Sequence, residues 1–126
     1  MKEIMAVIRM NMMNQTKSAL TEAGVSAFFA VEALGRGKGL VPKDLLDGVK
    51  QGSEEAAALL GEKGRLYPKR VLTVVVPEDM VETVVKTIMK VNITGKPGDG
   101  KIFVMPVTDA VRVRTGEKGD EAIDEM

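Results

Sequence analysis

Two strand-helix-strand patterns follow one another along this chain, and their order limits the folds that it can adopt. In the first pattern, residues 4–8 (IMAVI) form a short apolar run flanked by charges, which predicts a buried strand. Residues 14–23 (NQTKSALTEA) have the apolar spacing of a helix, and Gly24 follows as its stop. Residues 27–34 (AFFAVEAL) are rich in β-forming residues and predict the second strand.

The second pattern repeats this order in the other half of the chain. Residues 70–76 (RVLTVVV) are mostly β-branched and predict a strand that Pro77 ends. A helix should follow, because Pro-Glu-Asp suits a first turn and one helical face then collects Met80, Val84, Val85, Ile88 and Met89. Residues 102–107 predict the fourth strand, in which Pro106 indicates an edge or a strand end, and residues 111–114 could add a short fifth strand.

This order predicts an α+β fold of the ferredoxin-like type, βαββαβ, with two helices on one face of a single antiparallel sheet. The other face of the sheet has no helices to cover it, yet residues 4–8 are apolar on both sides of their strand. An apolar open face predicts self-association. The length of 126 residues suits one domain over residues 1–126.

Two segments stand outside this compact pattern. Residues 35–68 form a connection far longer than a hairpin loop, and such loops are usually functional or disordered. This segment is either a surface helical insertion, with a helical composition at residues 53–60, or a mobile recognition arm. The charged tail at residues 117–126 is expected to be loose.

Composition excludes several kinds of chemistry and partner. The chain has no Cys and no His, which removes disulfides, thiol catalysis, histidine-dependent nucleophiles and nearly all zinc sites. Its 18 basic and 18 acidic residues cancel, and aromatic residues make up only 3%, so nucleic acid is not an expected partner. No apolar run approaches the roughly 20 residues of a membrane span, and the first residues do not resemble a signal peptide, so a cytoplasmic protein is expected.

The stretch TGKPGDGK at residues 94–101 has the glycine and lysine spacing of a phosphate-binding P-loop. Ile102, however, stands where that motif needs Ser or Thr, and the loop lies between a helix and a strand instead of a strand and a helix. The ingredients of an anion site remain, because three glycines let backbone N–H groups approach a phosphate and the two lysines add charge. Thr94 supplies a hydroxyl, and Asp99 could orient a lysine or accept from a ribose hydroxyl. The stretch is either such a site or a glycine-rich turn with solvated lysines.

Three further basic residues favour the anion site. Arg112 and Arg114 are two residues apart in an expected extended stretch, which would point both to one face as a fork for phosphate oxygens. Lys69 starts the third strand at the base of the long connection. Together with the loop at residues 94–101, these residues predict a basic, glycine-lined site in a chain that is neutral overall.

The stretch TGKPGDGKIFVMPVTDAVRVRTGE closely resembles the C-terminal signature of the nitrogen-regulatory PII signalling proteins. MKEIMAVIRM and YPKRVLTVVVPEDMVETVVKTI resemble them too, so that the likeness covers nearly everything except the long connection. The resemblance implies a ferredoxin-like homotrimer with the uncovered sheet faces packed together, and ATP or ADP in the clefts between subunits. It also implies that the segment 35–68 is the T-loop, the arm with which these proteins touch their targets.

Carried over by position, the resemblance implies a set of nucleotide-binding residues. The residues similar to the phosphate-binding loop and its entrance are Thr94, Gly98, Asp99, Gly100 and Lys101. Arg112 and Arg114 resemble the phosphate-contacting arginines, and Lys69 resembles the lysine that meets the phosphates and 2-oxoglutarate. The positions that line the nucleotide cleft or the base of the T-loop are Val7, Gly35, Arg36, Gly37 and Val75. No protein side chain is implied as a metal ligand, so any Mg²⁺ would be held mainly by ligand oxygens.

The chain departs from the family pattern at the base of the T-loop. The sequence here is GRGKG instead of G-F-G-R-Q-K-G, and it lacks the glutamine that helps to hold the magnesium ion of 2-oxoglutarate. Binding of 2-oxoglutarate is therefore less securely implied than binding of ATP or ADP. The short base and long arm are similar to the PII branch encoded in nitrogenase gene clusters of archaea and some anaerobic bacteria. Members of that branch regulate nitrogenase and act with a sister paralogue, which adds a hetero-oligomer as an alternative.

The sequence leaves three function classes open. The first is a non-catalytic sensor whose T-loop regulates a target protein, with nitrogenase expected and an ammonium transporter or a biosynthetic enzyme as alternatives. The second is a nucleotide-hydrolysing enzyme, which the absence of His and of clustered carboxylates disfavours. The third is a structural trimer with a binding arm and no ligand control.

Overall fold

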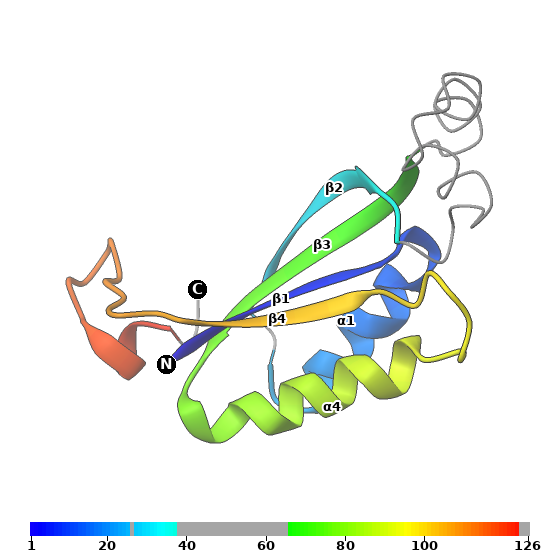
Figure 1. The fold of residues 1–126 in the computed structure, drawn as a ribbon. Coiled ribbons are helices and arrows are strands. Elements are labelled where there is room, and N and C mark those ends of the chain that lie inside the picture. The colour runs from blue at the N-terminus through cyan, green and yellow to red at the C-terminus, as the bar shows by residue number, and fades with distance from the viewer. Residues whose placement is uncertain (26, 38–65, 124–126) are drawn as a thin grey trace.

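The computed structural model of this protein describes residues 1–25, 27–37 and 66–123. They form one four-stranded antiparallel sheet in the order β2-β3-β1-β4, and two α-helices lie together on one face of it (Figure 1). In chain order the elements are β1 (Lys2–Arg9), α1 (Met13–Glu22), β2 (Phe29–Gly35), β3 (Tyr67–Val76), α4 (Val81–Asn92) and β4 (Lys101–Pro106). Short 3-10 helices lie at Met10–Met12, Glu78–Met80 and Gly119–Ala122. The predicted ferredoxin-like arrangement of four strands and two helices is confirmed.

The core lies between the sheet and the helices. In β1 the side chains of Ile4, Ala6 and Ile8 are buried, while the residues between them are only half-buried, as the period of two in a strand requires. Leu72 and Val74 lie opposite this row in β3 and are buried with it. The helices complete the core with Leu20, Val84 and Ile88. Of the predicted apolar face of α4, Met89 differs, since 51% of it is exposed.

The two helices are tied to each other by a buried polar contact. The Asn92 side-chain nitrogen donates to Thr16 Oγ1 at 3.1 Å and to the Ile88 carbonyl at 2.9 Å. Asn92 is the last residue of α4, so this contact also fixes the point where the loop at residues 94–100 leaves the helix. At the other helix, Gly24 takes a φ of +91° directly after α1, which confirms it as the stop.

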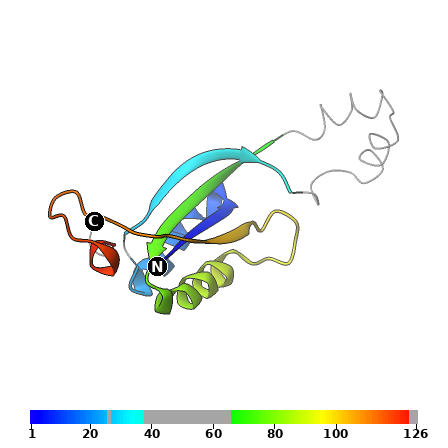
Figure 2. The same cartoon turned by 60° about the vertical axis from the view of Figure 1, so that its left-hand side comes forward.

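The opposite face of the sheet is not covered by any helix of the described residues (Figure 2). The register aligns Phe29, Thr73, Met5 and Phe103 in one row across all four strands. In this row Phe29 is 56% exposed and Phe103 is 46% exposed, and Val31 beside them is 57% exposed. Burying such a row against another surface is favourable, which supports the predicted self-association.

The predicted fifth strand is wrong. Val111 forms only an isolated bridge with Lys118, because the chain turns back at Gly116, whose φ is +74° and whose N–H donates to the Arg112 carbonyl at 2.7 Å. The tail expected to be loose contains the 3-10 helix Gly119–Ala122, and residues 124–126 lie outside the described residues. The expected helix at residues 53–60, and most of the connection at 35–68, also lie outside them.

Candidate phosphate-binding loop

The loop at residues 94–100 joins α4 to β4 and depends on three glycines with positive φ. These angles are +80° at Gly95, +99° at Gly98 and +109° at Gly100, a region that other residues rarely adopt. Gly100 has a second reason, because a Cβ placed on it would lie 2.0 Å from the carbonyl oxygen of Val7. The close approach arises where β4 starts to pair with β1, since Lys101 lies opposite Val7. The glycines therefore set the path of the loop onto the sheet.

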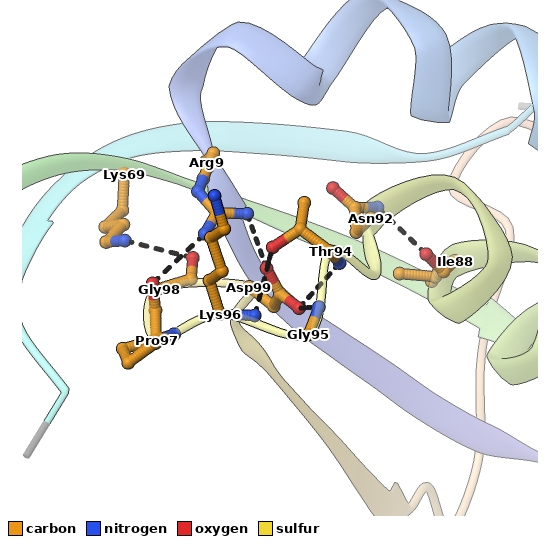
Figure 3. Close-up of polar contacts among 10 residues, drawn as sticks. All are labelled: Arg9, Lys69, Ile88, Asn92, Thr94, Gly95, Lys96, Pro97, Gly98 and Asp99. Atoms are coloured by element: carbon orange, nitrogen blue, oxygen red, sulfur yellow. Dashed lines mark hydrogen bonds and ion pairs between the residues drawn. The ribbon is translucent and has the colours of Figure 1, made fainter. Parts of the chain in front are cut away.

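Asp99 organises this loop from within. Its carboxylate accepts the backbone N–H of Thr94 at 2.7 Å and that of Gly95 at 2.9 Å. It also accepts the hydroxyl of Thr94 and, at 2.7 Å, the guanidinium of Arg9 (Figure 3). The hydroxyl and backbone hydrogen bonds from Thr94, with those from Arg9 and Gly95, hold the pKa of Asp99 well below its usual range. The cation that Asp99 pairs with is thus an arginine, not the lysine that the sequence suggested.

Two cations on neighbouring strands hold the outer part of the loop. Arg9 ends β1 and lies opposite Lys69 of β3. Arg9 Nη2 donates to the Pro97 carbonyl at 3.1 Å, and Lys69 Nζ donates to the Gly98 carbonyl at 3.5 Å. Only 9% of Lys69 is exposed, and none of the carboxylates in the described parts of the chain forms an ion pair with it. Sequence reasoning missed Arg9, because only the strand register brings it to a loop 90 residues away.

These contacts decide where the backbone amides of the loop point. The described residues contain no cis peptide bonds, so the carbonyl and the N–H of each peptide group point in opposite directions. The carbonyls of Pro97 and Gly98 face Arg9 and Lys69, and the N–H groups of Gly98 and Asp99 therefore face away from these cations. The Gly98 N–H has no acceptor among the described residues, while the Asp99 N–H belongs to the hydrogen-bonded turn at Pro97 and Gly98. A backbone N–H left open on a glycine-rich turn suits an anion.

The remaining residues of the loop add charge and support. Lys96 and Lys101 are both exposed, so their ammonium groups are accessible to a ligand. The Thr94 hydroxyl accepts the backbone N–H of Lys96 at 3.2 Å while it donates to Asp99. The hydroxyl that the sequence singled out is thus already engaged in holding the loop. The loop thus combines positive-φ glycines with two exposed lysines, and anion binding by it stays a prediction.

The sheet register brings a second set of predicted residues to the same end of the molecule. Val7 lies between Val71 and Lys101. Gly35 ends β2 opposite Tyr67, two positions from Lys69, and Arg36 and Gly37 follow it. A Cβ at Gly35 or Gly37 would meet no atom within 4 Å in the described chain. The described part of the chain therefore gives no steric reason for glycine at these two positions.

Arg112, Arg114 and Val75 lie at the other end of the sheet. The loop at residues 94–100 precedes β4 and the turn that carries both arginines follows it, so they extend from opposite ends of this strand (Figures 1 and 2). β4 has six residues, which corresponds to about 16 Å of strand. Val75 lines a hollow on that far side together with Val107 and Ala110. The arginines and the loop therefore do not meet within a single chain, and the predicted site that combines them stays a prediction for the cleft between subunits.

The two arginines are also not arranged as predicted. Residues 113–115 form a turn, not an extended stretch. The Arg112 guanidinium donates to Glu117 Oε1 at 3.2 Å and to the Glu121 carbonyl at 2.9 Å, and only 18% of its side chain is exposed. Arg114 is exposed at the tip of the turn beside Val113, which is fully exposed. Of the two arginines, Arg114 is the one whose side chain is accessible to a ligand bound to a neighbouring subunit.

Neither metal ligands nor membrane segments appear in the part of the chain that the structure describes. These residues contain no group of three or more Asp, Glu, His or Cys side chains that could hold a metal ion. No helix among them is long and apolar enough to cross a membrane.

Known proteins are similar in sequence to this chain over nearly its whole length. A family model described as nitrogen regulatory protein P-II matches residues 1–117. The nitrogen fixation nifHD region GlnB-like protein 2 of Methanobacterium ivanovii is 46% identical over 125 residues, which cover 98% of this chain and 99% of that protein. The nitrogen regulatory protein P-II 1 of Escherichia coli is 37% identical over 123 residues, which cover 98% of this chain and all of that protein. The crystal structure of Arabidopsis thaliana PII bound to citrate has a TM-score of 0.74 and 30% identity, and the match covers 99% of this chain and 91% of that one.

Proposed function

We propose a function for this chain from its place in a known family, since it belongs to the nitrogen regulatory P-II proteins. It is a nitrogen regulator, in a family that is generally non-catalytic. Within that family we propose that it senses nitrogen and energy status in the cytoplasm. In this proposal ATP and ADP compete for one site, and the bound nucleotide decides whether the T-loop at residues 35–68 engages a target protein.

One observation carries the nucleotide site, namely the Gly98 N–H, which faces away from Arg9 and Lys69 and has no acceptor in the described chain. Internal contacts hold the loop in this shape before any ligand arrives, so little ordering is needed when an anion binds. The exposed ammonium groups of Lys96 and Lys101 add charge at the same loop. A di- or triphosphate, with several oxygens, suits such a cluster of donors.

We propose that the site is completed by a second copy of the chain. The arginine turn and the loop are held apart by the length of β4, so one protomer cannot place Arg114 on a phosphate at residues 98–101. Trimers are typical of the family, and the exposed side chains of Phe29, Val31 and Phe103 on the open face supply an apolar surface to bury between copies. In a trimer, Arg112 and Arg114 of one subunit would approach the loop of the next subunit.

The same carboxylate that supports a binding site argues against hydrolysis. Asp99 accepts four donors, and its pKa lies well below the usual range. Such a carboxylate is a weak base and is poorly suited to activate water. The arrangement therefore favours a sensor over a nucleotide-hydrolysing enzyme.

We propose nitrogenase as the target, because relatives from several methanogens carry the name nitrogen fixation nifHD region GlnB-like protein 2. An ammonium transporter or a biosynthetic enzyme would be the alternative target. 2-Oxoglutarate would add to the ATP state, with Mg²⁺ held mainly by oxygens of the two ligands, because the T-loop base has no glutamine. A sister P-II chain could replace one or more subunits of the homotrimer.

Isothermal titration calorimetry of the whole protein with ATP and ADP, with and without Mg²⁺, tests the site. Lys101→Met should weaken both nucleotides about ten-fold, as expected for one lost charge-assisted hydrogen bond. Lys17→Met removes an exposed lysine of α1 and is the matched control, which should bind like the wild type. Absence of binding by the wild type under all four conditions would refute the nucleotide site.

The target requires a separate experiment. The protein should retain purified nitrogenase on a column in a manner that depends on ATP and 2-oxoglutarate, and it should not retain ammonium transporter in detergent. Retention of the transporter alone would replace nitrogenase with the alternative target. A variant in which residues 38–65 are replaced by a short glycine-serine linker should retain neither protein while still binding ATP.

A further inference from the structure

We propose that Arg9 is a positioning residue that holds the loop at residues 94–100 in the shape that receives phosphate. This inference rests on the proposed nucleotide site, but its first readout does not need a nucleotide. Arg9 ends β1, a central strand of the sheet, whereas the loop ends on the edge strand β4. Arg9 therefore links the loop at residues 94–100 to a central strand of the sheet.

The guanidinium of Arg9 makes two contacts at different points of the loop. One nitrogen donates to Asp99 Oδ1 at 2.7 Å, and the other donates to the Pro97 carbonyl at 3.1 Å (Figure 3). The planar fork of arginine can make both bonds at once, whereas a lysine presents a single ammonium group. The side chains are partly shielded, with 26% of Arg9 and 23% of Asp99 exposed. These contacts hold both ends of the Pro97–Asp99 segment at one fixed group.

Gly98 fits between these two contacts because it has no side chain. A Cβ at this position would lie 3.2 Å from Arg9 Nη2, so the guanidinium packs directly against the glycine. The positive φ of Gly98 then turns its peptide groups so that its carbonyl faces Lys69. The consequence is the orientation of the N–H groups of Gly98 and Asp99, which face away from both cations.

A surface ion pair alone would not carry this inference, because such pairs usually contribute little to stability. Arg9 differs because its partner, Asp99, also accepts the backbone N–H groups of Thr94 and Gly95. Loss of Arg9 would leave the carboxylate held only by residues of the same loop. We therefore expect the loop to lose its fixed position on the sheet while the fold stays intact.

The experiment compares ¹⁵N-labelled wild type, Arg9→Met and Arg9→Lys by NMR without nucleotide. Arg70→Met is the matched control, because Arg70 neighbours Lys69 in β3 and pairs with the exposed Glu32 instead of the loop. In Arg9→Met the amide signals of Gly95, Gly98 and Gly100 should shift or broaden. The hydrogen exchange of Gly95, whose N–H donates to the carboxylate that Arg9 holds, should accelerate about ten-fold or more. The control should leave these three signals unchanged, and thermal unfolding should remain cooperative in every variant.

Nucleotide affinity is the second readout. Arg9→Met should weaken ATP about ten-fold, and Arg9→Lys should restore part of the affinity because it can make one of the two contacts. Unchanged glycine signals in Arg9→Met would overturn the positioning role, as would altered signals with unchanged ATP affinity. If the wild type itself bound no nucleotide, the proposed function would fail, while the glycine signals would still report whether Arg9 holds the loop.

Discussion

Replacing Gly100 with alanine should weaken the fold by more than the backbone conformation alone explains. The new Cβ would lie 2.0 Å from the carbonyl oxygen of Val7 and 3.1 Å from its carbonyl carbon. Both are backbone atoms of β1, so no side-chain movement can relieve the contact. The start of β4 would have to move away from β1 by about 1 Å, against the fixed spacing of paired strands.

The magnitude follows from two contributions. The positive φ of +109° costs an alanine about 1–2 kcal/mol. Displacing β4 adds about 1–3 kcal/mol for overpacking and a weakened ladder hydrogen bond. The expected loss in the free energy of unfolding is therefore about 2–5 kcal/mol.

Gly95→Ala separates these contributions within the same loop. Gly95 has a similar φ of +80°, but a Cβ there would meet no atom within 4 Å. This variant should lose only the conformational contribution of about 1–2 kcal/mol. Urea unfolding at pH 7 and one fixed protein concentration measures both variants, because oligomer stability depends on concentration. If Gly100→Ala and Gly95→Ala were equally stable within about 0.5 kcal/mol, the close approach of the loop to β1 would be refuted.

Three other predictions concern the loop, the shared site and the open face. Folding lowers the pKa of Asp99 below its unfolded value, so the stabilisation that the carboxylate provides is complete at neutral pH and should decline as the pH falls below about 4. Asp99→Asn should have a lower free energy of unfolding at pH 7 than the wild type, and that free energy should fall less on acidification. Equal acid sensitivity of the two proteins in urea titrations would contradict this. If each site combines two subunits, a mixture of Lys101→Met and Arg114→Ala proteins should regain a fraction of tight ATP sites when the two are unfolded and refolded together, although each binds ATP weakly alone. Calorimetry measures the tight sites. A site within one chain predicts no recovery. Phe29→Glu should shift the protein to smaller species in light scattering at about 1–10 μM, because a charge would be buried between copies. Met89→Glu, on the exposed side of α4, is the control and should leave the mass unchanged. An unchanged mass for Phe29→Glu would show that the open face is not part of the interface.

Much of the fold could be predicted from local patterns. The alternation at residues 4–8, the β-branched run at 70–76 and the stop at Gly24 each act over a few neighbouring residues. Their signals therefore survive without knowledge of the rest of the chain. The predicted strand at 111–114 failed for the complementary reason, because the hydrogen bonds around Gly116 turn the chain before a strand can form.

The candidate site was predictable in composition but not in arrangement. The glycines, Lys101 and Asp99 could be recognised from the sequence, since a loop that approaches an anion needs these residue types. The role of Arg9 could not, because it depends on the register that places the end of β1 beside a loop 90 residues later. The residues next to Arg9 in the sequence give no sign that its partner is Asp99.

By itself, then, the sequence determined the order of strands and helices, the family and the residue types of the candidate phosphate-binding loop, because these reside in short-range patterns. Only the tertiary structure decided that Gly100 must be a glycine against Val7, that Arg9 holds Asp99, and that Arg114 lies at the far end of β4 from the loop. These relations depend on which strands pair and in which register, and pairing is set by the burial of the whole sheet against its helices. Contacts between residues distant in sequence therefore settled the geometry of the site.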